Sequence, residues 1–240
     1  MITDAPPRGA KRRAEFVKSE GITRLTLPSP EATRAATRQL ALAMAGGDKP
    51  PVRSACVALL GELARFYQVP MPEVKVLGVR PHVVTAGVCT YQLFGDYTPA
   101  TQRIRVWMRT AMRGQVSSPK ALLNTLLHEF CHHLDFTRLG CPDSPHTRGF
   151  YTRVDHLYHF ALATPADARR PLHWVKRGTR WQIDWQRSRT RPGRTLSSMM
   201  TEIAAPPSNT RDTGAPMDGG AQTINDSNTQ SRTRPHEQGR

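Results

Sequence analysis

Cysteine is scarce in this chain and is not arranged for cross-linking. The 240 residues hold four cysteines, Cys56, Cys89, Cys131 and Cys141, and no two of them form a CxxC pair. This spacing excludes a cysteine zinc ribbon and a dense disulfide framework. Reduced thiols in a cytoplasmic protein are therefore expected.

Long apolar runs are missing as well. The stretch MITDAPPRGAKRRAEFVK carries charge but is not followed by an apolar core of signal-peptide length. No other stretch is long and apolar enough to span a bilayer. We therefore expect a cytoplasmic location and no membrane partner.

Acidic residues are few compared with basic ones. The chain has 34 Lys and Arg against 19 Asp and Glu, a formal net charge of +15. A field of this sign attracts phosphate backbones without reading their sequence. Nucleic acid is therefore the first macromolecular partner to consider.

Composition divides the chain into four regions. We expect a disordered basic arm over residues 1–28, a globular domain over 29–165, a basic tryptophan-containing extension over 166–190 and a disordered tail over 191–240. The tail is rich in Ser, Thr, Pro, Gly, Asn and Arg, and its apolar residues are too sparse to offset the entropy of ordering.

Helical and strand patterns alternate within the globular region. Helices are expected from a cap at Ser29 to Gly46, over about 52–67, from a cap at Ser118 to near Gly140, and over about 147–163. The second helix presents apolar residues at helical spacing: Val52, Cys56, Leu59, Leu60, Leu63 and Phe66. Strands are expected over Glu73–Val79 and in VCTYQLFGDYTPATQRIRVWM, where a Gly/Asp/Pro turn joins two strands and Ile104, Val106 and Met108 share one face. The pattern predicts an α+β fold.

The segment LLNTLLHEFCHHLDF, residues 122–136, contains an HExxH arrangement. His128 and His132 are four residues apart, so on a helix they project from one face and can bind one tetrahedral cation. His133 lies about 100° further round and is expected to be a wall or neighbouring group. Glu129 follows the first ligand, where it can accept a proton from an attacking water. The arrangement predicts one Zn²⁺ per chain; a core helix with internally bonded histidines is the alternative.

A catalytic zinc ion usually takes a third protein ligand, and the residues that are missing limit the choice. No glutamate occurs between Glu129 and Glu202, which excludes a glutamate on the following helix. The continuation HExxHxxGxxH is excluded because Asp135 and Arg138 occupy its positions. We favour His146, since a short loop can fold it back over the first helix. The other candidates are Asp135, Asp143, Asp155, His156 and His159.

Two motifs together resemble the SprT-like zinc metallopeptidases. These are LLHEFCHHLDF and HTRGFYTRV, an HExxH helix followed by a loop and a third histidine before an aromatic pair. The segments FYQVPMPEVKVLG and FGDYTPATQRIRVWM are similar to the strands that precede the active helix in that family. The resemblance covers roughly residues 55–165. Many members carry a cysteine zinc ribbon after this core, whereas this chain has no cysteine after Cys141.

The resemblance implies a zincin-like minimal metalloprotease domain, in which a small mixed sheet packs on the HExxH helix. It implies that His128, His132 and His146 bind zinc, that Glu129 is the general base or acid, and that the aromatic pair is Phe150 and Tyr151. Protein substrates and peptide hydrolysis follow from it.

Two further features of such a site are expected here. The strand around Gln102–Met108 is a candidate for aligning substrate along a sheet edge. Tyr151, Arg153 and His156 are candidates for stabilising an oxyanion, although each is more simply explained as a packing or helix-surface residue.

The basic extension combines cations with aromatic rings. Between Arg169 and Arg194, nine Lys or Arg residues stand against one acidic residue, Asp184, and Trp174, Trp181 and Trp185 are interleaved. Such a composition suits non-specific binding of DNA or RNA, with cations on phosphates and rings stacked on bases. Equally, the tryptophans can dock the segment on the core while the charges face water.

Three functions therefore compete. The leading one is a zinc metallopeptidase acting on protein substrates and recruited to nucleic acid by its basic flanks. The second is a nucleic-acid-binding protein whose zinc site is structural or vestigial, and the third is a zinc-dependent hydrolase of a non-peptide substrate. Glu129 favours an enzyme, because a structural site needs no carboxylate beside its first ligand.

Overall fold

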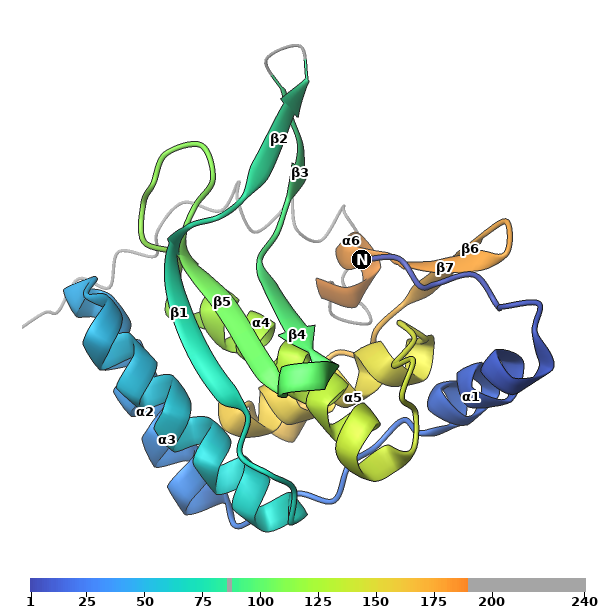
Figure 1. Ribbon diagram of the computed structural model, residues 1–240, viewed down its shortest axis with the longest axis horizontal. Coiled ribbons are helices and arrows are strands. Elements are labelled where there is room, and N and C mark those ends of the chain that lie inside the picture. Colours follow the sequence, from blue (N-terminus) through green and yellow to red (C-terminus); the bar gives the residue numbers. More distant parts are fainter. Residues whose placement is uncertain (86–87, 190–240) are drawn as a thin grey trace, which may run out of the picture. The chain divides into compact units, whose positions relative to one another are not determined.

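Helices and a small sheet are stacked in layers in the computed structural model, which describes residues 1–85 and 88–189 (Figure 1). These residues belong to a single compact unit, Met1–Gly193. The predicted tail over 191–240 lies outside the described residues. The helices are α1 (Ala10–Gly21), α2 (Pro30–Gly46), α3 (Lys49–Tyr67), α4 (Pro119–Leu134), α5 (Arg148–Ala161) and α6 (Trp185–Arg189). The strands are β1 (Glu73–Val79), β2 (His82–Thr85), β3 (Val88–Gln92), β4 (Gly95–Thr98), β5 (Arg103–Arg109), β6 (Trp174–Arg177) and β7 (Arg180–Ile183).

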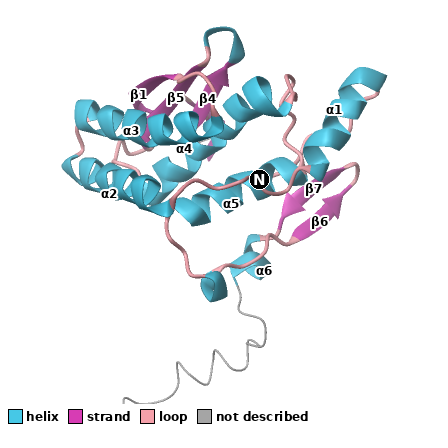
Figure 2. Ribbon diagram, turned by 90° about the horizontal axis from the view of Figure 1, so that it is seen from below, coloured by secondary structure: helices cyan, strands magenta, loops and turns pink. Residues whose placement is uncertain are grey.

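The main sheet is mixed and has three strands in the order β1-β5-β4. β1 runs parallel to β5 with Glu73 opposite Arg103, and β4 runs antiparallel to β5 with Gly95 opposite Val106. Figure 2 shows this sheet over α3 and α4, with α2 and α5 beneath them. The expected α+β class is confirmed, and α4, which carries HExxH, packs against β4 and β5.

The core lies between the sheet and the helices. Ile104, Val106 and Met108 share the fully buried face of β5, as their alternation predicts. The helical spacing in α3 correctly predicts most of its core-facing residues. Five of them are fully buried: Val52, Cys56, Leu59, Leu60 and Leu63. Phe66 is the exception and is 39% exposed at the end of that helix.

Local signals define the ends of α4. Ser118 precedes the helix and its Oγ accepts a hydrogen bond from the Ala121 N–H at 3.2 Å, while Pro119 occupies the first turn. The helix ends at Leu134, is followed by a π-helical turn over Asp135–Leu139, and is closed by Gly140 with φ of 63°. The predicted helix to Gly140 thus includes a change of helical type.

The amino-terminal region differs from its prediction. Residues 1–28 were expected to be a disordered arm, but α1 lies there and packs against α5. Gly149 permits the contact, because a Cβ at this position would lie 2.2 Å from the Ser19 carbonyl oxygen. Polar contacts complete it: the Arg148 N–H donates to the Glu20 carboxylate at 2.8 Å, and Arg153 donates to the Ser19 carbonyl at 2.8 Å. Contacts far apart in sequence therefore order a segment whose own composition is polar.

Two hairpins extend from the layers. The antiparallel pair β2–β3 projects away from the sheet (Figure 1), and β6–β7 lies within the basic tryptophan-containing extension expected over residues 166–190. The residues GDYT, predicted to lie in a turn, form β4, because Phe94 and the residues after it pair with β5; the chain turns instead at Pro99–Thr101. None of the helices in the described part of the chain is both long and apolar enough to cross a membrane.

Candidate metal centre

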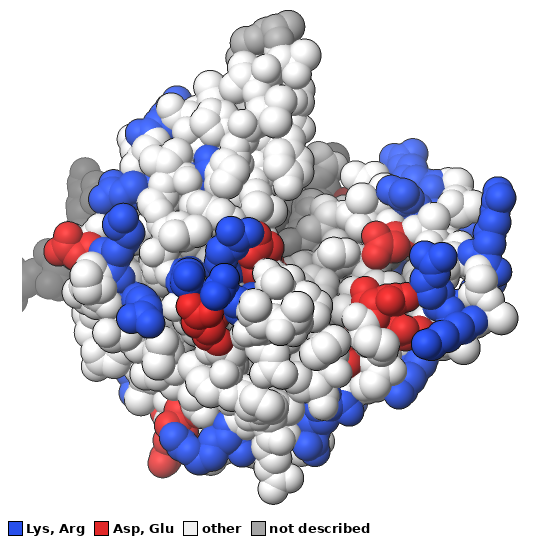
Figure 3. Space-filling view, viewed as in Figure 1, with Lys and Arg blue, Asp and Glu red and all other residues white. Residues whose placement is uncertain are grey.

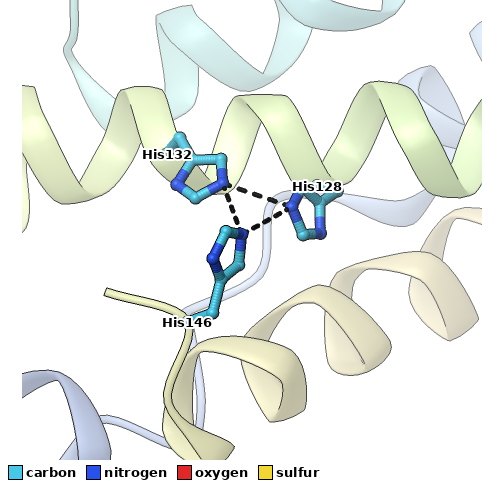
Figure 4. Close-up of side chains that lie close together, drawn as sticks. All are labelled: His128, His132 and His146. Carbon is cyan, nitrogen blue, oxygen red and sulfur yellow. Dashed lines mark hydrogen bonds between the residues drawn. The ribbon is translucent and has the colours of Figure 1, made fainter. Parts of the chain in front are cut away.

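Three histidines from two segments converge on one point. His128 and His132 project from one face of α4, and His146 comes from the loop that precedes α5 (Figure 4). The Nε2 atoms form a nearly equilateral triangle: His128 to His146 is 3.1 Å, His132 to His128 is 3.2 Å, and His132 to His146 is 3.1 Å. The three residues lie close enough to hold one metal ion.

The triangle has the size that a tetrahedral zinc site requires. Metal–nitrogen bonds of about 2.0–2.1 Å with tetrahedral angles separate the ligand atoms by roughly 3.3 Å. Burial lowers the pKa of His128 to about 3, with a further contribution from His146. Burial and the neighbouring His128 also hold the pKa of His132 well below its usual range. Both rings are therefore neutral at pH 7, which is the form that binds a metal.

The outer nitrogen of His132 is held by a relay of polar groups. Its Nδ1 lies 2.7 Å from the Oγ of Ser144, and that hydroxyl donates to Asp135 at 2.9 Å. Arg153 donates to both carboxylate oxygens of Asp135, at 2.7 and 3.0 Å, and both of these side chains are fully buried. With its proton on Nδ1, His132 presents the lone pair of Nε2 to the metal position.

Glu129 lies beside the histidines and is also removed from water. Its side chain is on the cleft next to His128, and the residue is 5% exposed. Burial raises the pKa of Glu129 to about 8, and the negative charge of Asp96 adds to this. Gly95 of β4 packs directly on it, since a Cβ there would lie 2.8 Å from Oε1 of Glu129.

A cleft of about 380 Å³ opens over these residues. It is lined by the N-terminal segment, β4, α4 and the loop before α5: Asp4, Gly95, Asp96, Tyr97, Pro99, His128, Glu129, His132, Phe136, Pro142, Asp143, Ser144 and His146. The three histidines therefore lie in a cleft beside β4, which stands at the end of the strand order in the main sheet.

His133 takes no part in the cluster, as its position on the helix predicts. Its Nε2 lies 2.8 Å from the carbonyl oxygen of Pro70, and its Nδ1 lies 3.0 Å from the hydroxyl of Tyr97. It is fully buried and joins α4 to the segment before β1 and to β4.

The other candidates for the third ligand have different partners. Asp135 is paired with Arg153, while Asp155 and His159 pair with one another at 3.4 Å. His156 Nδ1 lies 3.4 Å from the backbone nitrogen of Leu25. Asp143 lines the cleft but is not among the converging residues.

The oxyanion candidates do not line the cleft. The hydroxyl of Tyr151 donates to the Ile2 carbonyl at 3.2 Å, Arg153 is buried in its ion pair, and His156 faces Leu25. All three therefore have partners away from the cleft, whose lining residues do not include them.

The aromatic pair packs on the ligands. The ring of Phe150 stacks on His132 with centroids 4.5 Å apart, and the ring of Tyr151 stacks on His146 with centroids 5.6 Å apart. These ring contacts restrict the orientation of the two imidazole planes.

The prediction that the strand around Gln102–Met108 lies at the edge of the sheet is wrong. The segment Gln102–Met108 lies largely in β5, which is the middle strand and pairs on both sides, with β1 and with β4. The strand beside the cleft is β4, which in the described part of the chain pairs only with β5. The pattern FGDYTP was assigned to a turn, and this error concealed the strand.

Several residues around the metal position were missed by the sequence prediction. Asp4, Gly95 and Ser144 line the cleft or contact a histidine of the cluster. Gly95 stands in the quoted segment FGDYTPATQRIRVWM, but the sequence prediction gave none of the three a role at the site. A glycine inside a strand is a sign of close backbone approach, so Gly95 was detectable once β4 was known. Asp4 and Ser144 depend on chain crossings that leave no periodic signal.

Searches for related proteins leave the function to be argued from this geometry. No protein-family model, no curated protein and no solved structure matches the chain.

Proposed function

We propose that the chain is a zinc-dependent metallopeptidase with a zincin-like domain over residues 29–165. His128, His132 and His146 would hold one zinc ion and Glu129 would be the general base. A single observation carries this proposal: a buried carboxylate stands beside three converging imidazole nitrogens in a cleft at a sheet edge.

The donor set supports zinc among the possible metals. Among the described residues the converging group holds three imidazoles and no thiolate or further carboxylate, so a coordination position is left open, which is typical of catalytic rather than structural zinc sites. When bound there, zinc supplies Lewis-acid chemistry, polarising a carbonyl group and promoting the ionisation of water.

Glu129 supplies the proton transfers. Its carboxylate accepts a proton from the attacking water and delivers it to the amine that leaves when the peptide bond breaks. Burial that raises its pKa to about 8 brings this group close to neutral pH. A cation at the three histidines opposes that shift and favours the ionised base.

β4 is suited to hold the substrate. Its outer edge borders the cleft, and an extended peptide can pair with it through backbone hydrogen bonds, adding a strand to the sheet. Recognition of this kind depends little on side chains, and it suits unfolded or flexible segments of protein substrates.

Binding of DNA or RNA is a second proposed property. Lys and Arg side chains gather over α1 and the β6–β7 hairpin (Figure 3), including the exposed Lys11, Arg12, Arg13, Lys176, Arg177 and Arg180. The tryptophans have mixed roles. Trp174 packs near Tyr151 at 6.0 Å and Trp181 lies 4.4 Å from the Arg148 guanidinium, whereas Trp185 is 40% exposed. The contact would be mainly to the backbone of the nucleic acid and strongly salt-dependent.

Cleavage assays with Glu129→Gln test the peptidase. Wild type and variant are incubated with zinc and an unfolded protein, with and without single-stranded DNA. We expect the variant to lose at least about 100-fold in rate, because general acid–base catalysis contributes about 10²–10⁴. Glu31→Gln, at an exposed position on α2, is the control and should cleave as wild type does.

Metal analysis distinguishes the alternatives. About one zinc per chain should bind to wild type and to Glu129→Gln, and should be lost in His128→Ala, His132→Ala and His146→Ala. Zinc bound with no cleavage by wild type under any condition, together with DNA binding, would support a nucleic-acid-binding protein with a structural site. Retention of zinc by His146→Ala would remove the third ligand from the proposal.

A further inference from the structure

The N-terminal segment runs from the β6–β7 hairpin to the metal cleft. The Thr3 N–H donates to the Trp181 carbonyl at 2.7 Å, and the Trp181 N–H donates to the Thr3 hydroxyl at 2.8 Å. The Ile183 N–H donates to the Met1 carbonyl at 3.1 Å. With these bonds the segment pairs with β7 at an isolated antiparallel bridge, Ile2 opposite Gln182. The next residue, Asp4, therefore has a defined position, and it lines the cleft.

Asp4 makes hydrogen bonds with both the carbonyl and the N–H group of His146. The Asp4 N–H donates to the His146 carbonyl at 2.9 Å, and the His146 N–H donates to Oδ2 of Asp4 at 2.8 Å. The same Oδ2 lies 3.6 Å from Nδ1 of the His146 ring, while Nε2 of that ring faces His128 and His132. Among the described residues, this is the carboxylate that pairs with His146.

The contact compensates for a weakness of the third ligand. His128 and His132 are fixed by a capped helix, whereas His146 stands in a loop, which must be ordered before it can bind a metal. A carboxylate facing the outer nitrogen of a ligating histidine places the proton on that nitrogen and makes the inner nitrogen a better donor. Ser144 acts on His132 in the corresponding place.

We propose that Asp4 is a positioning residue of the metal site, holding His146 with Nε2 directed at the other two ligands. The role rests on the proposed metal site but not on peptidase activity. The N-terminal segment is then a functional part of the centre, and the hairpin to which it is bonded supports the third ligand.

Zinc affinity in the full chain tests this role. Metal-free wild type, Asp4→Asn and Asp4→Ala are titrated with zinc in competition with a chromogenic chelator at pH 7.5. We expect both variants to bind zinc about 10–100-fold more weakly. Asp143→Asn is the matched control: Asp143 lines the same cleft, and its carboxylate makes no contact with the three histidines. It should change the affinity by less than about threefold, because exposed charges contribute little.

A double-variant cycle separates positioning from general damage. In a His146→Gln background, Asp4→Asn should cause no further loss of affinity, since Asp4 acts through that ring. Thermal unfolding of the metal-free Asp4→Asn protein should match wild type, because an asparagine oxygen can still accept the His146 N–H.

Three outcomes would overturn the role of Asp4 alone: wild-type affinity in Asp4→Asn, an equal loss in Asp143→Asn, or the same loss with and without His146. Absence of zinc binding by wild type would instead remove the metal site and this role together.

Discussion

At the scale of single residues, the position of Glu129 depends on a neighbour without a side chain. A Cβ at Gly95 would lie 2.8 Å from Oε1 of Glu129 and 2.6 Å from Cγ2 of Thr125. Both distances are shorter than van der Waals contact, so β4 can approach α4 this closely only with glycine at the site. The same close approach places the edge of β4 against the proposed general base.

Substituting Gly95 should therefore damage catalysis without removing the metal. We expect Gly95→Ala to displace Glu129, lower the cleavage rate at least about 10-fold, and reduce stability by about 1–3 kcal/mol as overpacking does. Zinc content should stay at the wild-type level, because no ligand is touched. The measurements are cleavage rate, metal analysis and urea unfolding.

Gly78→Ala is the matched control for that change. Gly78 also lies in a strand, β1, and a Cβ there would meet no atom within 4 Å. Its variant should keep wild-type activity and stability to within about 1 kcal/mol. Equal cleavage rates and stabilities in the two alanine variants would mean that the contact between Gly95 and Glu129 does not affect catalysis.

At the scale of elements, one buried ion pair joins α1, α5 and the turn after α4. Arg153 of α5 donates to Asp135 of the π-helical turn and to the backbone carbonyls of Ser19 and Ile22 at the end of α1. Asp135 in turn supports Ser144 and, through it, His132. A π-helical turn at this place fits the frequent occurrence of such turns at functional sites.

Removing Arg153 should cost far more than removing a surface arginine. We expect Arg153→Ala to lower the free energy of unfolding by about 3–5 kcal/mol, because it leaves a buried carboxylate without its cation. Arg103→Ala breaks the ion pair with Glu73, in which the Arg103 side chain is 35% exposed and the Glu73 side chain 42% exposed. This change should lower the free energy of unfolding by at most about 1 kcal/mol. Urea unfolding of the two variants at one pH checks the difference, and similar losses would contradict the assigned role of the buried pair.

Elements with strong local signals were predicted well from the sequence. Ser118 and Pro119 marked the start of α4, and alternation in β5 identified its buried face. HExxH spacing selected His128 and His132 because a helix repeats every 3.6 residues. His146 was selected as the third ligand from the resemblance and from the absence of glutamate between Glu129 and Glu202, because helical periodicity gives no information about a ligand in a loop.

Elements stabilised from elsewhere in the chain could not be predicted in the same way. The sequence of α1, AKRRAEFVKSEG, has no apolar stripe, and Ser19 is its buried residue. Its order comes from Gly149, Arg148 and Arg153, more than 120 residues later in the chain. GDYT was assigned to a turn from its Gly and Asp, although pairing with β5 overrides that preference.

At the scale of the whole molecule, two buried titratable groups, His128 and Glu129, make the free energy of unfolding depend on pH. Burial shifts their pKa values in opposite directions. Burial lowers the pKa of His128 to about 3 from an ordinary value of 6.5, so the unfolded chain takes up that proton first as the pH falls. Stability from His128 is therefore complete above pH 6.5 and is lost below it. Burial raises the pKa of Glu129 to about 8 from 4.5, so the folded chain takes up that proton first and gains stability as the pH falls below 8.

Variants of the metal-free protein should separate these two effects. Relative to wild type, Glu129→Gln should lose stability more steeply as the pH falls from 8 to 5, by about 1.4 kcal/mol per pH unit, since the compensating proton uptake is gone. His128→Gln should lose stability less steeply than wild type between pH 6.5 and 5, by up to a similar slope. Urea unfolding in the presence of a chelator, at half-unit steps of pH, measures both.

The shape of these profiles reports on the burial of the centre itself. Profiles of Glu129→Gln and His128→Gln that run parallel to wild type would mean that water reaches both groups freely in the folded chain. Opposite changes of slope would instead place a proton-accepting carboxylate and a neutral imidazole together in one poorly solvated site, which the proposed peptide hydrolysis requires.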